Sequence, residues 1–309
     1  MVRSIVSLLL SLLFLSVAGL PLKTTTAFER RAVDQGLYST VFFIFGALTK
    51  QLLTATFDDL VFYLKYAFSA YGGQCARPNG NTLVQQIDDR KTDTQGFIAR
   101  DDSKKEIVVA MRGTSSLQDF RTDRDITLVP FQSPGVNPPA GAQAHHGFLT
   151  AWNAVAPQII AAVKSQLRAN PDYTIATTGH SLGGGLSSLA GISMQQNFPN
   201  TTVHMFTYGQ PRTGNAEYAN FINKQFGENA SRSVHTNDGV PTIIPASANG
   251  YRHHGIEFFQ NPDPASAAMT KKCDSSGEDP TCSAAIASKG INAAHLTYFN
   301  IKLGTLFCS

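Results

Sequence analysis

The 309-residue sequence predicts an α/β protein with a mainly parallel central sheet and helices on both faces. Short apolar and β-branched runs at residues 106–111, 173–178 and 203–208 are suited to buried strands. Segments with apolar residues at helical spacing alternate with them, and the second strand leads into a helix through a glycine-rich turn. Because no internal repeat or low-complexity linker interrupts this alternation, we expect residues 32–309 to form one domain.

The N-terminus has the pattern of a secretory signal peptide. Arg3 precedes an apolar run from Ile5 to Leu15 and small residues follow, which predicts residues 1–19 as the signal. The run is too short to cross a bilayer and no later apolar stretch is long enough, so we expect a secreted protein without a transmembrane anchor. Residues 20–31 end in two arginines, and both a short propeptide and a solvated arm explain this stretch.

Composition and modification signals agree with an extracellular enzyme. A net charge of +3 without a basic run gives no reason to expect nucleic acid as a partner. The motifs that begin at Asn200 and Asn229 are N-glycosylation acceptors in polar stretches.

The four cysteines are even in number and are not spaced like zinc ligands. Three pairings are possible. We favour Cys273–Cys282, which closes a local loop, and Cys75–Cys308, which ties the first helix to the C-terminus.

The first half of the domain reads as a helix followed by strands. Residues 40–71 carry apolar side chains at helical spacing, and Gly72-Gly73 ends the pattern. Residues 79–100 alternate weakly and predict peripheral strands joined by turns, with a further turn at 101–105. The run at 106–111 is almost wholly apolar, which indicates a central strand buried on both faces.

The second half alternates helices with strands. After the stretch at 126–131 and a Pro/Gly-rich loop, an amphipathic helix begins at about residue 147 with apolar residues at steps of three and four: Phe148, Trp152, Val155, Ile159 and Val163. The elements expected after the glycine-rich turn are a helix, a strand at 203–208, a helix at 216–226, a strand at 231–234 and a turn at 237–239.

The glycine-rich turn at residues 179–183 reads Gly-His-Ser-Leu-Gly, the G-x-S-x-G pattern of a nucleophile elbow. A strand precedes it and a helix follows it, as this motif requires. Glycines flank the serine because a side chain there would collide across so tight a turn. The turn exposes the Ser181 hydroxyl and puts the Leu182 N–H at a helix N-terminus, where it favours a developing oxyanion.

A serine nucleophile needs a base and an acid, and this elbow expects them in the chain order Ser, Asp, His. Asp238 directly follows the strand at 231–234, at the end where active residues of such sheets collect. An Asx turn in Asn237-Asp238-Gly239 would by itself explain this residue better. The chain order nevertheless favours Asp238 as the acid.

Eight histidines compete for the role of base. His180 lies inside the elbow and points away from the serine hydroxyl. Four histidines precede Asp238 and break the expected order: His145, His146, His204 and His235. His253 and His254 suit polar positions at the entry to a strand at 255–259. We therefore predict His295, late in the chain, as the base that takes the Ser181 proton.

A second oxyanion donor is needed beside Leu182. Thr114 follows the central strand and offers both its N–H and its hydroxyl. Because nucleophile, base and oxyanion donors all come from the chain, no metal or cofactor is predicted.

Five ordered motifs resemble the fungal class 3 lipases, a group that also contains secreted feruloyl esterases. They are Arg112-Gly113-Thr114, residues 179–184, residues 208–215, residues 237–241 and Ala294-His295. The resemblance covers roughly residues 57–308 and implies an α/β-hydrolase fold with the triad Ser181, Asp238 and His295. It also implies oxyanion donors Thr114 and Leu182 and a lid over the active site at about residues 115–125. The two favoured cysteine pairings resemble pairings found in that family.

The lid and the pocket wall point to different substrates. The lid carries Leu117 and Phe120 among charged residues and resembles the polar lids of feruloyl esterases. Thr114 also resembles that branch, because lipases often have serine there. Ile126 and Phe148 are apolar where those esterases have phenol-binding tyrosines, and an apolar wall suits an acyl chain.

We predict a triacylglycerol lipase that works through an acyl-enzyme. A feruloyl esterase is the alternative, and a non-catalytic secreted binding protein is a more remote one. The expected partner is a lipid or ester substrate at an oil–water interface, and the enzyme is expected to be a monomer.

Overall fold

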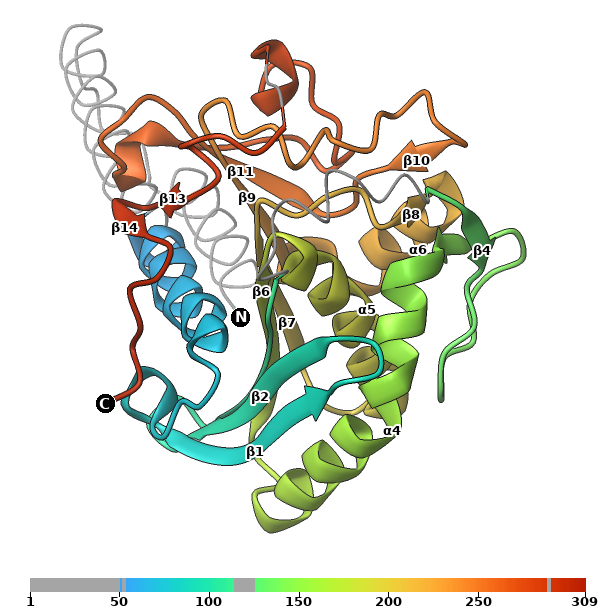
Figure 1. The fold of residues 1–309 in the computed structure, drawn as a ribbon, viewed down its shortest axis with the longest axis vertical. Helices are drawn as coiled ribbons and strands as arrows, with labels where there is room; N and C mark the ends of the chain where they lie inside the picture. Colours follow the sequence, from blue (N-terminus) through green and yellow to red (C-terminus); the bar gives the residue numbers. More distant parts are fainter. Residues whose placement is uncertain (1–50, 52–53, 114–125, 288–289) are drawn as a thin grey trace, which may run out of the picture. The chain divides into compact units, whose positions relative to one another are not determined.

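The computed structural model describes residue 51 and residues 54–113, 126–287 and 290–309. Residues 53–309 form one compact unit around a sheet with the strand order β1-β2-β3-β6-β7-β9-β11-β12 (Figure 1). The predicted signal peptide, the stretch at 20–31, the predicted oxyanion donor Thr114 and the predicted lid with Leu117 and Phe120 lie outside the described residues.

The strands of this sheet are β1 (Thr82–Asp89), β2 (Thr94–Asp101), β3 (Glu106–Met111), β6 (Thr174–His180), β7 (Val203–Tyr208), β9 (Ala230–His235), β11 (Ile256–Gln260) and β12 (Thr270–Lys272). The five from β3 to β11 pair in parallel. β1, β2 and β12 pair antiparallel at the two edges. The prediction of a mainly parallel sheet is therefore confirmed, with antiparallel strands added at its margins.

Helices cover both faces of the sheet (Figure 1). One face packs against α4 (His146–Ala169), α5 (Leu182–Asn197) and α6 (Ala216–Phe226). The other face packs against the helical residues 54–69. Alternate side chains of β3 point to opposite faces of the sheet. Ile107 and Val109 pack in the apolar cluster on the side of α4, α5 and α6, and Val108 packs in the cluster on the side of residues 54–69.

Shorter elements complete the unit. A second sheet has the order β10-β8-β5-β4, formed by β4 (Leu128–Pro130), β5 (Gln143–His145), β8 (Gly214–Asn215) and β10 (Tyr251–Arg252). β13 (Thr297–Tyr298) pairs with β14 (Ile301–Lys302). The 3₁₀ turns are Ala70–Gly72, Pro78–Gly80, Gly227–Asn229, Ala267–Met269 and Ser283–Ala285.

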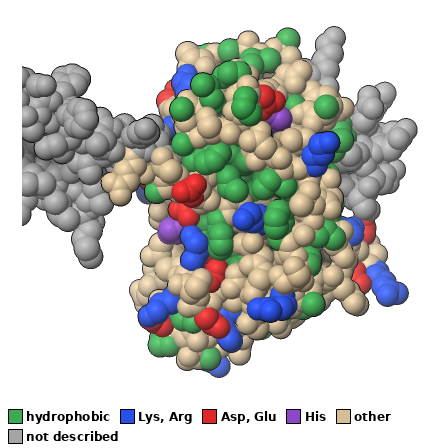
Figure 2. Space-filling view, turned by 90° about the vertical axis from the view of Figure 1, so that its left-hand side faces the viewer, with side chains coloured by type: hydrophobic (Ala, Val, Ile, Leu, Met, Phe, Trp, Pro, Cys, Tyr) green, Lys and Arg blue, Asp and Glu red, His purple; other side chains and the backbone are tan. Residues whose placement is uncertain are grey.

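The structure contains the disulfides Cys75–Cys308 and Cys273–Cys282, the two pairings that the sequence favours. On the face shown in Figure 2, lysine and arginine side chains lie scattered among acidic and apolar ones. This distribution matches the small net charge of +3.

Glu106 is a buried carboxyl at the start of β3, with only 3% of the residue exposed. The Tyr63 hydroxyl donates to its Oε2 at 2.6 Å, and the Thr174 hydroxyl to its Oε1 at 3.4 Å. Burial raises the pKa of Glu106 to about 7, although the Tyr63 hydrogen bond opposes this. The folded chain therefore holds this proton more tightly than the unfolded chain, and stability falls as pH rises from 4.5 to about 7.

Glu106→Gln should stabilise the protein above neutral pH, because the amide oxygen still accepts from Tyr63 while the buried charge is removed. We expect a gain of up to about 3 kcal/mol in unfolding free energy at about pH 8 and little gain at about pH 4.5. Thermal unfolding at both pH values measures it. Glu228→Gln, which removes an exposed carboxylate, is the control. A gain for Glu106→Gln that is equal at both pH values would contradict the explanation.

Candidate active site

Ser181 lies on the sharp turn between β6 and α5. Its φ of 61° and ψ of −131° are a strained conformation for a residue with a side chain. A Cβ atom on Gly179 would lie 2.1 Å from the carbonyl oxygen of Gly183, so glycine is required there. The sequence pattern of a nucleophile elbow thus corresponds to the geometry of one.

The structure brings Ser181, His295 and Asp238 together. His295 Nε2 lies 3.0 Å from Ser181 Oγ, and His295 Nδ1 lies 2.9 and 3.1 Å from the two carboxylate oxygens of Asp238. A carboxylate only accepts hydrogen bonds, so Nδ1 carries the proton and Nε2 is free to accept the serine proton. All three residues are at least 97% buried.

Asp238 is held ionised by several donors. The Tyr298 hydroxyl donates to its Oδ2 at 2.5 Å, and the Val240 N–H donates to its Oδ1 at 2.9 Å. Burial pushes the pKa of Asp238 upward, but His295 and these hydrogen bonds outweigh it, and the pKa lies below its ordinary value. Sequence reasoning missed Tyr298, although its position three residues after His295 was a usable signal.

Of the two predicted oxyanion donors, the structure describes Leu182. Leu182 is the first residue of α5, where an N–H has no carbonyl of its own helix to bond. Met111 at the end of β3 pairs with Gly179 at the elbow, so the chain leaves β3 beside Ser181. Thr114 itself lies outside the described residues, and its role stays a prediction.

Gly209 packs directly on the acid and the base. It has a φ of +56°, and an added Cβ would lie 2.8 Å from Asp238 Oδ2 and 2.9 Å from His295 Nδ1. We expect Gly209→Ala to reduce kcat by about 100-fold, because the added methyl group would displace His295 and misalign it with Ser181.

Gly227→Ala is the matched control for Gly209→Ala. Gly227 has a φ of +53° with nothing within 4 Å of an added Cβ, so its substitution brings the backbone strain without the clash. Rates on a soluble ester and melting temperatures of both variants measure the difference. Equal losses of kcat would show that strain, and not displacement of the triad, is responsible.

The other histidines have structural partners. His180 is fully buried, with Nδ1 2.9 Å from the Tyr71 hydroxyl and Nε2 2.9 Å from the His295 carbonyl oxygen. Burial lowers the pKa of His180 to about 3, so the ring is neutral. His253 and His254 precede β11 as expected, and they are buried and bond to Pro241 and Ser188.

The structure describes Ile126 and Phe148, the two residues of the predicted apolar wall. Phe148 is 3% exposed and stacks on His145 at 4.1 Å. It also lies against α5, where a Cβ on Gly185 would be 3.1 Å from its ring. Ile126 is half-buried, and its carbonyl accepts from the Tyr251 hydroxyl at 3.2 Å. Contact of Ile126 and Phe148 with an acyl chain stays a prediction.

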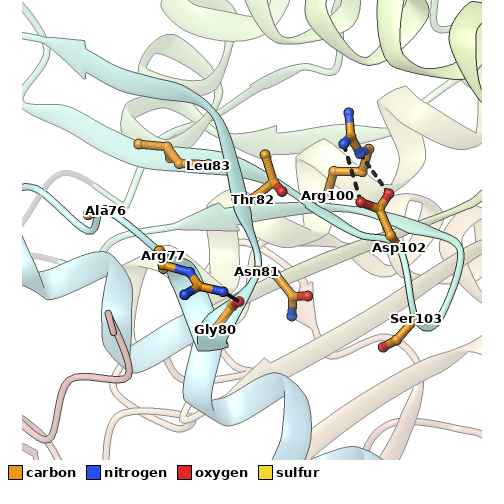
Figure 3. A pocket seen from close by; sticks show the side chains of 9 residues that line it. All are labelled: Ala76, Arg77, Gly80, Asn81, Thr82, Leu83, Arg100, Asp102 and Ser103. Carbon is orange, nitrogen blue, oxygen red and sulfur yellow. Dashed lines mark hydrogen bonds and ion pairs between the residues drawn. The ribbon is translucent and has the colours of Figure 1, made fainter.

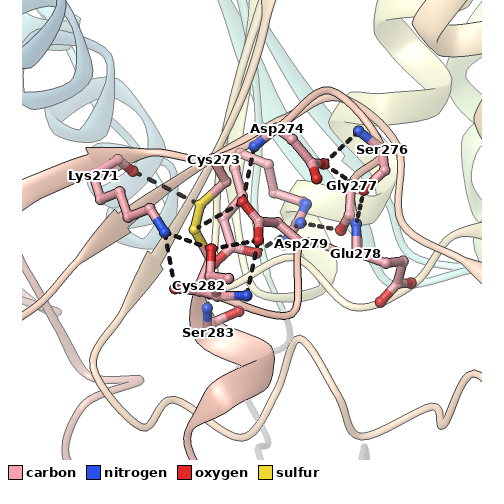
Figure 4. Close-up of a disulfide and its surroundings, with 12 residues drawn as sticks. Lys271, Cys273, Asp274, Ser276, Gly277, Glu278, Asp279, Cys282 and Ser283 are labelled. Atoms are coloured by element: carbon pink, nitrogen blue, oxygen red, sulfur yellow. Dashed lines mark hydrogen bonds and ion pairs between the residues drawn. A yellow bond between two sulfur atoms is a disulfide. The ribbon is translucent and has the colours of Figure 1, made fainter.

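The loop closed by Cys273–Cys282 is built on internal hydrogen bonds (Figure 4). Hydrogen bonds from Thr281 and from the Asp274 N–H lower the pKa of Asp279 to about 2. Within the described ranges, the one cluster with metal-ligand spacing is Glu257, Cys273 and Cys282. Its two sulfurs are bonded to each other and therefore offer no thiolate ligands.

The same loop is anchored to the segment that follows Asp238. Glu278 forms a two-pronged ion pair with Arg212, with both distances 2.7 Å. Arg212 in turn donates to the carbonyl of Ile244 at 2.8 Å. The loop therefore supports the chain after the acid.

A polar groove of about 480 Å³ lies at the β1–β2 edge (Figure 3). Its walls are Ala76, Arg77, Gly80, Asn81, Thr82, Leu83, Arg100, Asp102 and Ser103. Arg77 donates to the Gly80 carbonyl, and Arg100 pairs with Asp102. The groove contains none of the residues predicted to carry chemistry.

Comparison with known proteins agrees with this site. Residues 108–248 match the family model of class 3 lipases. A secreted alkaline triacylglycerol lipase of Penicillium cyclopium is 33% identical, over 82% of this chain and 87% of that protein. The fold is similar to that of a triacylglycerol lipase from Penicillium expansum, with a TM-score of 0.75 and 33% identity over 82% of this chain and 97% of the other.

A further solved structure is described as a triacylglycerol lipase whose catalytic centre is a serine protease triad. It has a TM-score of 0.71 and 30% identity, over 82% of this chain and 96% of that one. These similarities extend over most of the compact unit and include the α/β-hydrolase fold. The chain belongs to the class 3 lipase family.

Proposed function

We propose that this chain is a secreted triacylglycerol lipase in which Ser181 forms the acyl-enzyme. One observation carries the proposal, namely the hydrogen-bonded series from Ser181 Oγ through His295 to the Asp238 carboxylate. The relatives named as triacylglycerol lipases support the substrate class. Leu296 directly follows His295 and is 37% exposed, which puts an apolar side chain at the surface beside the triad.

The reaction follows from the tautomer of His295, which carries its proton on Nδ1 and leaves Nε2 free to accept another. His295 Nε2 accepts the Ser181 proton while Oγ attacks the ester carbonyl, and Asp238 stabilises the resulting imidazolium. The Leu182 N–H and Thr114 stabilise the oxyanion. His295 then returns the proton to the leaving alcohol, and a water molecule activated by the same ring releases the fatty acid from Ser181.

The glycan acceptors and the disulfides support secretion. Asn200 and Asn229, the predicted glycan acceptors, are exposed. Two disulfides are formed, as is usual for proteins of an oxidising compartment. Among the helices of the described ranges, none combines the length and apolar character needed to cross a membrane.

The test is the initial rate on emulsified long-chain triacylglycerol beside the rate on soluble methyl ferulate. We expect faster triacylglycerol hydrolysis, because the residues predicted to line the acyl site lack phenolic hydroxyls. Ferulate release as the dominant activity would overturn this substrate assignment and favour a feruloyl esterase. A sharp rise in rate once an emulsion forms would indicate a lid that opens at the interface.

A further inference from the structure

The loop that carries His295 is held from two sides by buried histidines. His235 on β9 places Nδ1 2.9 Å from the carbonyl oxygen of Ala294. His180 places Nε2 2.9 Å from the carbonyl oxygen of His295 itself. Two consecutive carbonyls, those of Ala294 and His295, are thus bonded to side chains at the ends of β9 and β6.

His235 is in turn held by an acid. Its Nε2 lies 3.0 and 3.1 Å from the two carboxylate oxygens of Asp263. The His235 side chain is 5% exposed and that of Asp263 is 57% exposed. The Ala294 carbonyl and the Asp263 carboxylate are both hydrogen-bond acceptors, and one ring nitrogen of His235 faces each of them.

Asp263 also has a fixed position. Gln260 at the end of β11 donates from Nε2 to Asp263 Oδ1 at 3.1 Å, and its Oε1 accepts the Phe299 N–H at 2.8 Å. Gln260 therefore contacts the chain after His295, at Phe299, and His235 contacts it before His295, at Ala294. Asp263 is bonded to both of these side chains.

The backbone at Ala294 matters because His295 lies outside any helix or strand. The local bonds of this turn include two from the His295 N–H, to the carbonyl and side-chain oxygens of Asn292 at 3.1 and 3.2 Å. The Thr297 N–H adds a longer bond of 3.3 Å to the Ala294 carbonyl. A shift of about 1 Å at a reacting group is enough to reduce a rate by about 100-fold. The contact at the Ala294 carbonyl therefore bears directly on the 3.0 Å separation between His295 and Ser181.

We propose that His235 and Asp263 are a positioning pair, which fixes the catalytic base His295 through the backbone carbonyl of Ala294. Neither residue touches the substrate. The proposal rests on the proposed function, because it assumes that His295 is the base for Ser181.

Two amide substitutions separate the contacts of His235. In His235→Asn the amide nitrogen replaces Nδ1 and keeps the donor to Ala294. In His235→Gln it replaces Nε2 and keeps the contact with Asp263 only. We expect His235→Gln to lower kcat on a soluble short-chain p-nitrophenyl ester by about tenfold or more with KM little changed, and His235→Asn to keep kcat within about threefold of wild type.

Inactivation by a small organophosphonate provides a second readout, because it also requires His295 to take the Ser181 proton. His254→Gln is the matched control, since His254 is 2% exposed and bonds to Ser188 and Gln210. Its melting temperature should fall as much as that of His235→Gln without the loss of kcat or of inactivation rate.

Asp263→Ala changes an exposed residue and tests the pair even if His235→Gln does not fold. We expect kcat to fall by a few-fold and KM to stay constant. Equal kcat for wild type and Asp263→Ala, equal losses in the Asn and Gln variants, or a matching loss in His254→Gln would each overturn the positioning role while leaving the lipase assignment intact. A wild-type enzyme without Ser181-dependent hydrolysis would instead overturn both.

Discussion

Ser181→Ala is expected to lower ester hydrolysis by about 10⁴- to 10⁶-fold, because no acyl-enzyme forms without the hydroxyl. The side chain fills a tight turn, and alanine occupies less space than serine, so the fold should be retained. Initial rates on a soluble ester measure the loss, and circular dichroism checks the fold.

Ser193→Ala is the control for the nucleophile. Ser193 is a buried serine farther along α5, and its hydroxyl has no hydrogen-bond partner among the described residues. We expect near wild-type rates. Hydrolysis by Ser181→Ala at a rate close to wild type would exclude Ser181 as the nucleophile. Absence of hydrolysis in the wild type on every ester tested would favour a secreted binding protein.

Asp238→Asn should cost about 10⁴-fold in kcat. The Tyr298 hydroxyl donates to Oδ2, so the amide oxygen takes that position. The NH₂ group then lies at the Oδ1 position, 3.1 Å from His295 Nδ1, where it also deprives the Val240 N–H of its acceptor. When this NH₂ group donates to Nδ1, His295 carries its proton on Nε2. A ring in that tautomer cannot take the Ser181 proton.

Tyr298→Phe distinguishes weaker stabilisation of the Asp238 carboxylate from a change in the tautomer of His295. It removes one donor to Asp238 and leaves the contacts between Asp238 and His295 in place, so we expect a loss of about tenfold or less. The two variants are compared by kcat on a soluble ester and by the rate of organophosphonate inactivation. A loss in Tyr298→Phe as large as that in Asp238→Asn would contradict the tautomer explanation.

Local patterns predicted the core of this fold well. The run at 106–111 is the buried β3, and the elbow pattern predicted the tight turn that joins β6 to α5 at Ser181. Chain order selected Asp238 and His295, whose side chains are hydrogen-bonded although the two residues are 57 positions apart. Each of these inferences used a signal contained within a few residues or in the order of motifs.

The contacts that depend on tertiary packing could not be read in this way. Chain order excluded His235 as the base, but nothing near it in sequence indicates a bond to Ala294, 59 residues later. Its partner Asp263 lies in the Asn-Pro-Asp-Pro stretch at 261–264, where nothing in the sequence indicates a contact with His235. The three-residue edge strand β12 and the two-residue strands β8 and β10 are too short to show a period, and their pairing is set by the neighbouring strands.

The Cys75–Cys308 disulfide has a consequence for survival outside the cell. It joins positions 233 residues apart, so nearly the whole catalytic unit lies within one covalent ring. A single cut by an extracellular protease inside that ring opens the chain without releasing either fragment. The two pieces stay tethered and can keep packing together, so nicked enzyme should separate into fragments on a denaturing gel only after reduction.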